Sequence, residues 1–95
     1  MATADKEIIL LKVSGQDKPG VTAGLTAILA TYGATILDIG QADIHDTLSL
    51  GILFEVKAGS GSGNVLKDLL FKGYELGINV KFIPITIPDY EIWVK

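Results

Sequence analysis

The chain has 95 residues and a formal net charge of −3, so it is long enough for one folded domain and too short for two. Hydrophobic residues make up 48% of it, which favours a packed core, and the absence of cysteine excludes disulfides and thiolate metal sites. Eight lysines without any arginine, together with the excess of acids, argue against nucleic acid as a partner. No apolar run reaches the length of a membrane span and no secretory segment opens the chain, so we expect a cytoplasmic protein with no membrane partner.

The first predicted elements are a strand over residues 7–14 and a helix behind it. The strand is apolar on both alternating faces, which is typical of a strand inside a sheet. Pro19 suits the first position of a helix, where its missing N–H is no loss. Apolar residues then recur with helical spacing at Val21, Leu25, Ile28, Leu29 and Tyr32. Gly33 supplies the left-handed residue that ends this helix.

Two strands over 35–45 and 48–56 follow, and the short polar step Asp46-Thr47 predicts a hairpin between them. A Gly-Ser-rich loop over 58–63 leads into a helix over 65–76, for which Ser62 or Asn64 is the expected cap. That helix should turn one side inward, at Leu66, Leu69, Leu70 and Gly73, and end at Gly77. The last strand covers 79–87, and Pro84 places it at a sheet edge because proline cannot donate to the ladder.

The order β-α-β-β-α-β predicts an α+β fold, the ferredoxin-like sandwich of a four-stranded antiparallel sheet backed by two helices. The usual strand order of that fold, 4-1-3-2, agrees with an interior first strand and an edge last strand. We expect a short tail over 1–6 and one domain over 7–88. Residues 89–95 resemble the start of another alternating strand, so we expect the chain to be cut where a following domain begins.

No charged residue lies between Lys18 and Asp38, and the first helix falls wholly inside that gap. Its outer side carries small residues where a solvated helix normally carries Lys and Glu; they are Ala23, Thr26, Ala27 and Ala30. One interpretation is a contact with another chain or domain, made close by the small side chains. The alternative is an alanine-rich surface that faces water.

The turn from Gly15 to Thr22 is the one chemically distinctive segment. It joins a central strand to a helix N-terminus, where free N–H groups favour an anion such as an amino-acid carboxylate, while Asp17 could face the ammonium group. The candidate ligand-binding residues are Gly15, Gln16, Asp17, Lys18, Gly20, Val21 and Thr22. The alternative is that Asp17 only caps the helix and the glycines only permit a tight turn.

The remaining motifs of the sequence predict no further chemistry. The Gly-Ser run lacks the Lys-Ser/Thr ending of a phosphate loop. Asp43, His45 and Asp46 are interpreted as a surface histidine beside turn acids rather than a metal site. No serine or threonine is set up with a base and an acid, so we expect no catalytic residue, no metal and no cofactor in this chain.

The segments Val13–Thr22, Tyr32–Gln41 and Leu48–Leu53, together with Ile44-His45, resemble the first N-terminal ACT domain of bacterial phosphoserine phosphatases, most closely those of the Bacteroidetes type. The resemblance covers about residues 7–87. It implies a regulatory module that forms dimers and binds an amino acid, L-serine or glycine, near the first turn. Asp17 and Gly20 match the positions that contact serine in similar domains.

The resemblance also implies a parent enzyme that hydrolyses O-phosphoserine to L-serine and phosphate. Such phosphatases belong to the haloacid-dehalogenase class, use Mg²⁺ and carry an Asp-x-Asp motif. That motif is absent from these 95 residues, so this chain itself should hydrolyse nothing. Two alternatives stay open: a tandem-ACT transcriptional regulator of the glycine-cleavage repressor type, and a purely structural dimerisation module.

Overall fold

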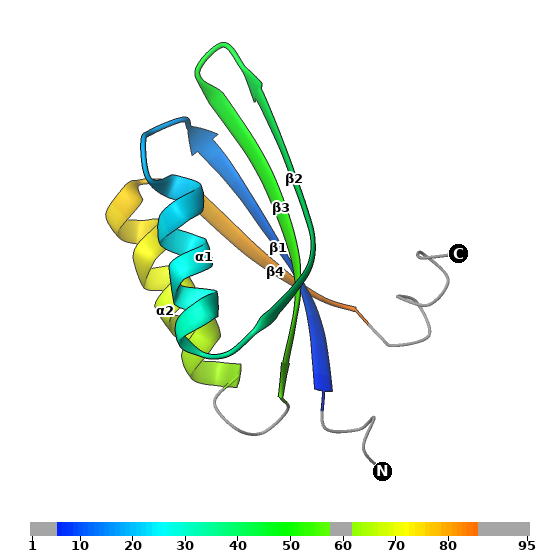
Figure 1. Cartoon of the computed structure of the whole chain (residues 1–95). Helices are drawn as coiled ribbons and strands as arrows, with labels where there is room; N and C mark the ends of the chain where they lie inside the picture. Colours follow the sequence, from blue (N-terminus) through cyan, green and yellow to red (C-terminus); the bar gives the residue numbers. More distant parts are fainter. Residues whose placement is uncertain (1–5, 58–61, 86–95) are drawn as a thin grey trace, which may run out of the picture.

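Four antiparallel strands form one sheet in the computed structural model, in the order β2-β3-β1-β4, and two helices cover one of its faces (Figure 1). The structure describes residues 6–57 and 62–85. The strands are β1 (Lys6–Gln16), β2 (Thr35–Ile44), β3 (Thr47–Lys57) and β4 (Asn79–Ile85), and the helices are α1 (Val21–Thr31) and α2 (Ser62–Leu76). The predicted ferredoxin-like α+β sandwich and its strand order are confirmed.

The position of β1 explains why both of its faces are apolar. It pairs with β3 along one side and with β4 along the other. Ile9, Leu11 and Val13 belong to the core beneath the helices, whereas Ile8 and Leu10 alternate with them on the opposite face. Pro84 lies opposite Ile9 in β4, and β4 is an edge strand, as the proline predicts.

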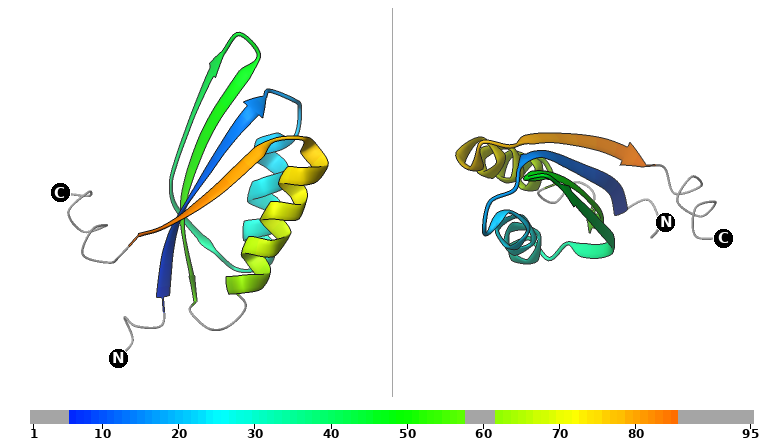
Figure 2. Two further views of the ribbon diagram at one scale, coloured as in Figure 1. Left: turned by 180° about the vertical axis from the view of Figure 1, so that it is seen from behind. Right: turned by 90° about the horizontal axis from the view of Figure 1, so that it is seen from above.

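The core lies between the helices and the sheet. It is built from aliphatic side chains and one phenylalanine on alternate positions of β1 and β3, on the inner sides of both helices and at one position between α2 and β4: Ile9, Leu11, Val13, Val21, Leu25, Leu29, Leu48, Leu50, Ile52, Phe54, Val56, Val65, Leu69 and Ile78. Seen from above, α1 and α2 lie side by side on the same face of the sheet (Figure 2).

Both helices end as their glycines predict. Gly33 and Gly77 have φ angles of 71° and 69°, the left-handed region that glycine enters without strain. After α1, the N–H of Ala34 donates to the carbonyl of Leu29 at 2.9 Å, and after α2 the N–H of Ile78 donates to that of Gly73 at 3.0 Å. These bonds close a Schellman motif at each end.

Two predicted turns are wrong by one or two residues. Pro19 does not open α1, because the N-cap is Gly20 and the helix begins at Val21. The hairpin turns at His45 and Asp46, whose φ angles are 50° and 52°, and Thr47 is already in β3. A two-residue turn of this kind needs two positive φ angles, which a β-branched threonine resists.

The prediction for α2 needs two corrections. The helix begins at Ser62, three residues earlier than expected, so Asn64 lies inside it and does not cap it. Leu70 was expected to point inward but is 51% exposed, because the buried stripe of α2 is narrower and runs through Val65, Leu69 and Gly73. Most of the Gly-Ser-rich loop, residues 1–5 of the expected tail, and the expected following segment 89–95 lie outside the described residues and stay predictions.

Among the helices in the described part of the chain, none is long and apolar enough to cross a membrane.

Candidate functional site: the turn before the first helix

The turn between β1 and α1 begins with a close backbone approach at Gly15. A Cβ atom there would lie 3.1 Å from Cγ2 and 3.3 Å from Cα of Ile78, and the φ of Gly15 is 153°. The next residue, Gln16, is the last of β1 and lies opposite Thr47 at the start of β3. Gly15 is therefore needed where the end of β1 packs closely against Ile78, two residues after the end of α2.

The N-terminus of α1 is left without a side-chain cap. Gly20 is the N-cap residue, in a left-handed conformation with φ 87°, and no side chain of the described residues bonds to the helix end. The N–H of Val21 reaches the carbonyl of Lys18 at 3.4 Å. The N–H groups of Thr22 and Ala23 meet no acceptor within residues 6–57 and 62–85. Asp17 does not cap this helix, so the alternative prediction that it serves only as a helix cap is wrong.

Asp17 lies instead in a group of three carboxylates. Its N–H donates to the carbonyl of Asp46 at 2.7 Å, which ties the turn to the hairpin. A side-chain hydrogen bond with Asp43 raises the pKa of Asp17 above its ordinary value, and desolvation and the charges of Asp43 and Asp46 act in the same direction. Three acids gathered in this way favour a cationic group among them.

Lys18 points away from that acid group toward the other helix. Its ammonium donates to the carbonyl of Leu76, the last residue of α2, at 3.1 Å. A cation at a helix C-terminus is favourable because the free carbonyls carry partial negative charge. Lys18, a predicted ligand residue, therefore holds the end of α2, and its charge already has a partner.

A chain of polar side chains links the helix start to the acids. The hydroxyl of Thr22 donates to Oε1 of Gln41 at 3.0 Å, and Nε2 of Gln41 donates to Oδ1 of Asp43 at 3.4 Å. Gln41 and Asp43 are absent from the site predicted from the sequence. The signal that could have found them is their alternate spacing in β2, which puts both on the side of the sheet that carries α1.

The expected interface residues lie on α1, and its three alanines are on the side opposite the buried stripe of Val21, Leu25 and Leu29. Ala23, Ala27 and Ala30 are exposed, and Thr26 is half-buried with its hydroxyl bonded to the carbonyls of Thr22 and Ala23. In β2, Ile36 and Ile39 pair with the core residues Phe54 and Ile52, so they point to the helix side. They are nevertheless 40% and 45% exposed. We call Ala23, Ala27, Ala30, Ile36 and Ile39 the α1–β2 flank.

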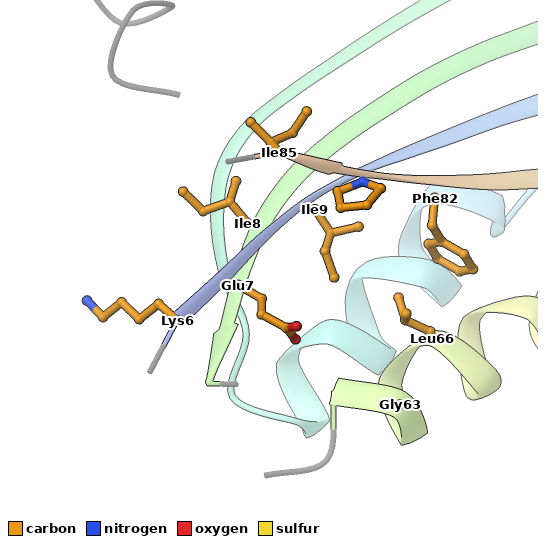
Figure 3. Close-up of a pocket in the computed structure, with 9 residues that line it drawn as sticks. Lys6, Glu7, Ile8, Ile9, Gly63, Leu66, Phe82 and Ile85 are labelled. Atoms are coloured by element: carbon orange, nitrogen blue, oxygen red, sulfur yellow. The ribbon is translucent and has the colours of Figure 1, made fainter. Parts of the chain in front are cut away.

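A separate cleft of about 330 Å³ lies at the opposite end of β1, between β4 and the start of α2. Ile9, Leu66, Phe82 and Pro84 line it, and the carboxylate of Glu7 points into it (Figure 3). None of the predicted ligand or interface residues takes part in this cleft. Within the described ranges, no group of three or more acidic or histidine side chains is placed to hold a metal ion.

Comparison with known proteins agrees with this geometry. Residues 7–83 match the model of an ACT domain. The chain is 36% identical to the phosphoserine phosphatase SerB2 of Mycobacterium tuberculosis over 63 residues, which is 66% of this chain and 15% of that enzyme. It is 35% identical over 72 residues to the UPF0237 protein MK1213 of Methanopyrus kandleri, which is 75% of this chain and 80% of that protein.

Solved structures share the fold. A putative glycine cleavage system transcriptional repressor superposes with a TM-score of 0.78 at 17% identity, over 85% of this chain and 47% of that one. An ACT domain protein from Streptococcus pneumoniae superposes with a TM-score of 0.67 at 20% identity, over 82% and 89% of the two chains. The match to the family model spans most of the sequence and the fold is the one it requires; the chain belongs to the ACT domain family.

Proposed function

We propose that this chain is a regulatory ACT domain that binds a small amino acid, L-serine or glycine, at the turn before α1. The observation that carries the proposal is the pairing of two unbonded N–H groups, of Thr22 and Ala23, with the acid group around Asp17. The N–H groups suit a ligand carboxylate and the acids suit its ammonium. Each charge-assisted hydrogen bond contributes about 1.5–3 kcal/mol, and a millimolar ligand needs only about 4 kcal/mol.

The proposal includes pairing with a second ACT domain through the α1–β2 flank. Small side chains on α1 let another backbone approach closely, and no charge on α1 opposes the loss of water. Ile36 and Ile39 of β2 add exposed apolar surface on the same side of the sheet as α1. Because Thr22 bonds to Gln41 of β2, the ligand turn and the flank are joined, and a second chain on the flank would also border the ligand.

We further propose that the domain regulates a phosphoserine phosphatase of the Bacteroidetes type, as part of L-serine biosynthesis. Two relatives are named phosphoserine phosphatase, the mycobacterial protein and one from Streptomyces coelicolor that is 46% identical over 39 residues. Hydrolysis of phosphoserine yields serine and phosphate, so a domain that binds serine would sense the product of its parent. Mg²⁺ and the hydrolysis itself would belong to a catalytic domain outside this chain.

Three alternative functions compete with this proposal. The fold likeness to the putative glycine-cleavage repressor is compatible with a transcriptional regulator that acts through a protein partner. The UPF0237 proteins, of which this chain spans about four fifths, are compatible with a module that acts alone. A purely structural dimer would self-associate in the same way with or without an amino acid.

Calorimetry tests the ligand. L-Serine, glycine and O-phosphoserine are titrated separately into the chain, and we expect a millimolar dissociation constant for at least one of the first two. Asp17→Asn should weaken that binding at least ~10-fold because the ammonium loses its charged partner. Glu75→Gln, an acid removed from the exposed end of α2, is the matched control and should change nothing. Silence of the unmodified chain up to tens of millimolar amino acid would contradict the proposal.

A further inference from the structure

The face of the sheet turned away from the helices, the outer face, differs from one end to the other (Figure 2). Directly opposite residues of an antiparallel pair point to the same side, so each cross-strand row belongs to one face. In the outer rows nearer the start of β1, Ile8 and Leu53 are only 4% and 7% exposed. The next two rows are exposed apart from the half-buried Gly51, and we call them the open end: Lys81, Lys12, Gly51 and Gly40, then Asn79, Ser14, Ser49 and Ala42.

Two lysines lie side by side in the first row of the open end. Lys12 and Lys81 are direct partners across β1 and β4, an arrangement that is unfavourable for like charges. Neither forms an ion pair in the part of the chain that the structure describes. Of the acids on this face, Glu55 pairs with Lys6, and the Cα of Asp38 is two strands and one row from that of Lys12, about 12 Å away. Positive charge is therefore concentrated at the open end of a chain whose net charge is −3.

The second row of the open end supplies neutral hydrogen-bond donors. Ser14 lies directly opposite Asn79 on one side and Ser49 on the other. Among residues 6–57 and 62–85, none of these three side chains has a hydrogen-bond partner. Hydroxyl and amide groups donate readily to the oxygens of an anion. Together with the two lysines they line a hollow of about 260 Å³.

A second, shallow hollow of about 360 Å³ adjoins the first at Lys12 and Ser49. Gly40 and Gly51, direct partners in β2 and β3, line it beside Leu10. The chain's own packing does not require glycine at either position, because neither has a positive φ angle. A Cβ at Gly40 would meet no atom within 4 Å, and one at Gly51 would meet only Cδ1 of Leu10 at 3.9 Å. Glycine inside a strand often marks the close approach of a ligand, so the two hollows together offer a charged half and an apolar half.

We propose that the open end binds a phosphate monoester of a small, flat organic group. The phosphate lies between Lys12 and Lys81, and the organic group lies over Gly40 and Gly51. A phosphate monoester carries close to two negative charges near pH 7 and three strong acceptor oxygens. The two ammonium groups match that charge and relieve their own repulsion, while the serine hydroxyls and the asparagine amide of the second row donate to the oxygens. Lysine binds phosphate as a point charge, so the site needs no arginine.

Charge and size favour this ligand over other anions. A carboxylate has one charge and would leave half of the lysine charge unbalanced. A long polyanion is unsuitable because the excess of acids elsewhere in the chain would repel it. With strands about 4.8 Å apart and rows about 6.8 Å apart, the lysines and the donors of the second row fit within roughly 7 by 10 Å, the scale of a small molecule. The open end lies on the opposite face of the sheet from α1, and its use does not rest on amino-acid binding.

Nuclear magnetic resonance of the isotope-labelled full chain tests the charged half. Sodium phosphate is titrated at constant pH and ionic strength, and we expect saturable shifts of the amide signals of Lys12, Ser14 and Lys81, with a dissociation constant of roughly 1–10 mM. Lys12→Gln and Lys81→Gln should each weaken binding at least ~10-fold, because each removes one of the two charges on the anion. Lys67→Gln, which removes an exposed lysine of α2, is the matched control and should change nothing. Circular dichroism checks that every variant is folded.

Phenyl phosphate, titrated in the same way, tests the apolar half. We expect it to bind at least ~5-fold more tightly than inorganic phosphate, because its ring covers apolar surface, and to shift the signals of Gly40 and Gly51 as well. Gly40→Val fills the second hollow with a side chain that suits a strand. This variant should lose the advantage of phenyl phosphate and still bind inorganic phosphate like the unmodified chain.

Four results would overturn the inference. The lysine site is excluded by silence up to tens of millimolar phosphate, or by lysine variants that bind like the unmodified chain. Shifts confined to Thr22 and Ala23 would place the anion at the turn before α1. Phenyl phosphate that binds no more tightly than phosphate would exclude a monoester over the glycine pair. Shifts of Lys12 and Lys81 that follow protein concentration without phosphate would assign these lysines to an acid of a second copy. Serine binding is read at the turn, so failure here and failure of the proposed amino-acid site are distinguishable.

Discussion

The two helices pack against the same sheet and end in the same way, but their outer sides differ. Fully buried leucines reach the core from both, Leu25 and Leu29 from α1 and Leu69 from α2, and each helix is closed by a left-handed glycine. The outer side of α2 carries Lys67, Asp68, Lys72 and Glu75, with exposed apolar residues among them. Between Val21 and Thr31, α1 carries no charge at all.

The difference lies in size and charge rather than in exposed apolar area. Phe71 and Tyr74 of α2 are large and lie beside charges that keep water around them. The exposed side chains of α1 are mostly alanines, which contribute little to the stability of a lone chain but allow close approach. Equal inner sides and unequal outer sides indicate that α1 does two tasks, packing and recognition, while α2 does mainly the first.

The largest effect we expect is equal on the two helices. Leu25→Ala in α1 and Leu69→Ala in α2 each remove a fully buried side chain and should lower the free energy of unfolding by about 2–5 kcal/mol. Urea denaturation measures both. If Leu25→Ala alone lowered the free energy of unfolding by less than about 1 kcal/mol, α1 would be packed more loosely than α2. The two helices would then differ in their inner sides as well.

Two helical glycines sharpen the comparison. In Gly73→Ala the new Cβ would overlap Cγ2 of Val80, so despite the better helix propensity of alanine we expect a net loss of about 1–2 kcal/mol. In Gly24→Ala the nearest atom, Cε of Lys72, is at an ordinary 3.7 Å, so we expect a gain of about 0.5–1 kcal/mol. Urea denaturation measures both variants. The change in the free energy of unfolding should have opposite signs for the two, because only Gly73 is in close contact with the sheet.

A charge on each outer side tests recognition. Ala27→Glu should weaken pairing through the α1–β2 flank by at least ~10-fold, because the carboxylate would be buried without a partner. Phe71→Glu on α2 should leave that pairing unchanged. Sedimentation equilibrium measures the association of both variants. If Phe71→Glu weakened association and Ala27→Glu did not, the interface would lie on α2.

The smallest effect concerns pH at the start of α1. The folded chain raises the pKa of Asp17 above 3.8, so its contribution to stability is present below that value and is lost as the pH rises through the raised pKa. Asp17→Asn removes the carboxylate that Asp43 and Asp46 repel. The variant should therefore melt at about the same temperature as the parent at pH 3 and at a slightly higher one at pH 7. A lower melting temperature at pH 7 would show that the acid group is stabilising without a ligand.

Much of the fold could be predicted from the sequence because its signals are local. Two apolar faces placed the first strand inside the sheet, Pro84 placed the last at an edge, and Gly33 and Gly77 marked the helix ends. The hairpin was misplaced because alternation alone does not say which residues accept a positive φ. Leu70 was misplaced because helical spacing fixes the direction of a buried stripe but not its width.

The candidate site was predictable only in part because its contacts are long-range. Asp17 was singled out by its place before a helix, but its neighbours Asp43 and Asp46 reach it through the pairing of Gln16 with Thr47 at the hairpin. Lys18 was placed in the ligand site because the sequence does not reveal that its ammonium ends on the carbonyl of Leu76. Strand register and helix packing decide such contacts.

The most direct test of the central claim is a titration of the chain with L-serine and glycine, followed by the backbone amide signals in nuclear magnetic resonance. The account predicts saturable shifts at Asp17, Thr22 and Ala23 for at least one of the two ligands, with smaller changes at Gln41 and Asp43 and none at Phe71 or Tyr74. Absence of shifts at the turn up to tens of millimolar, or shifts confined to the cleft lined by Phe82 and Leu66, would contradict it.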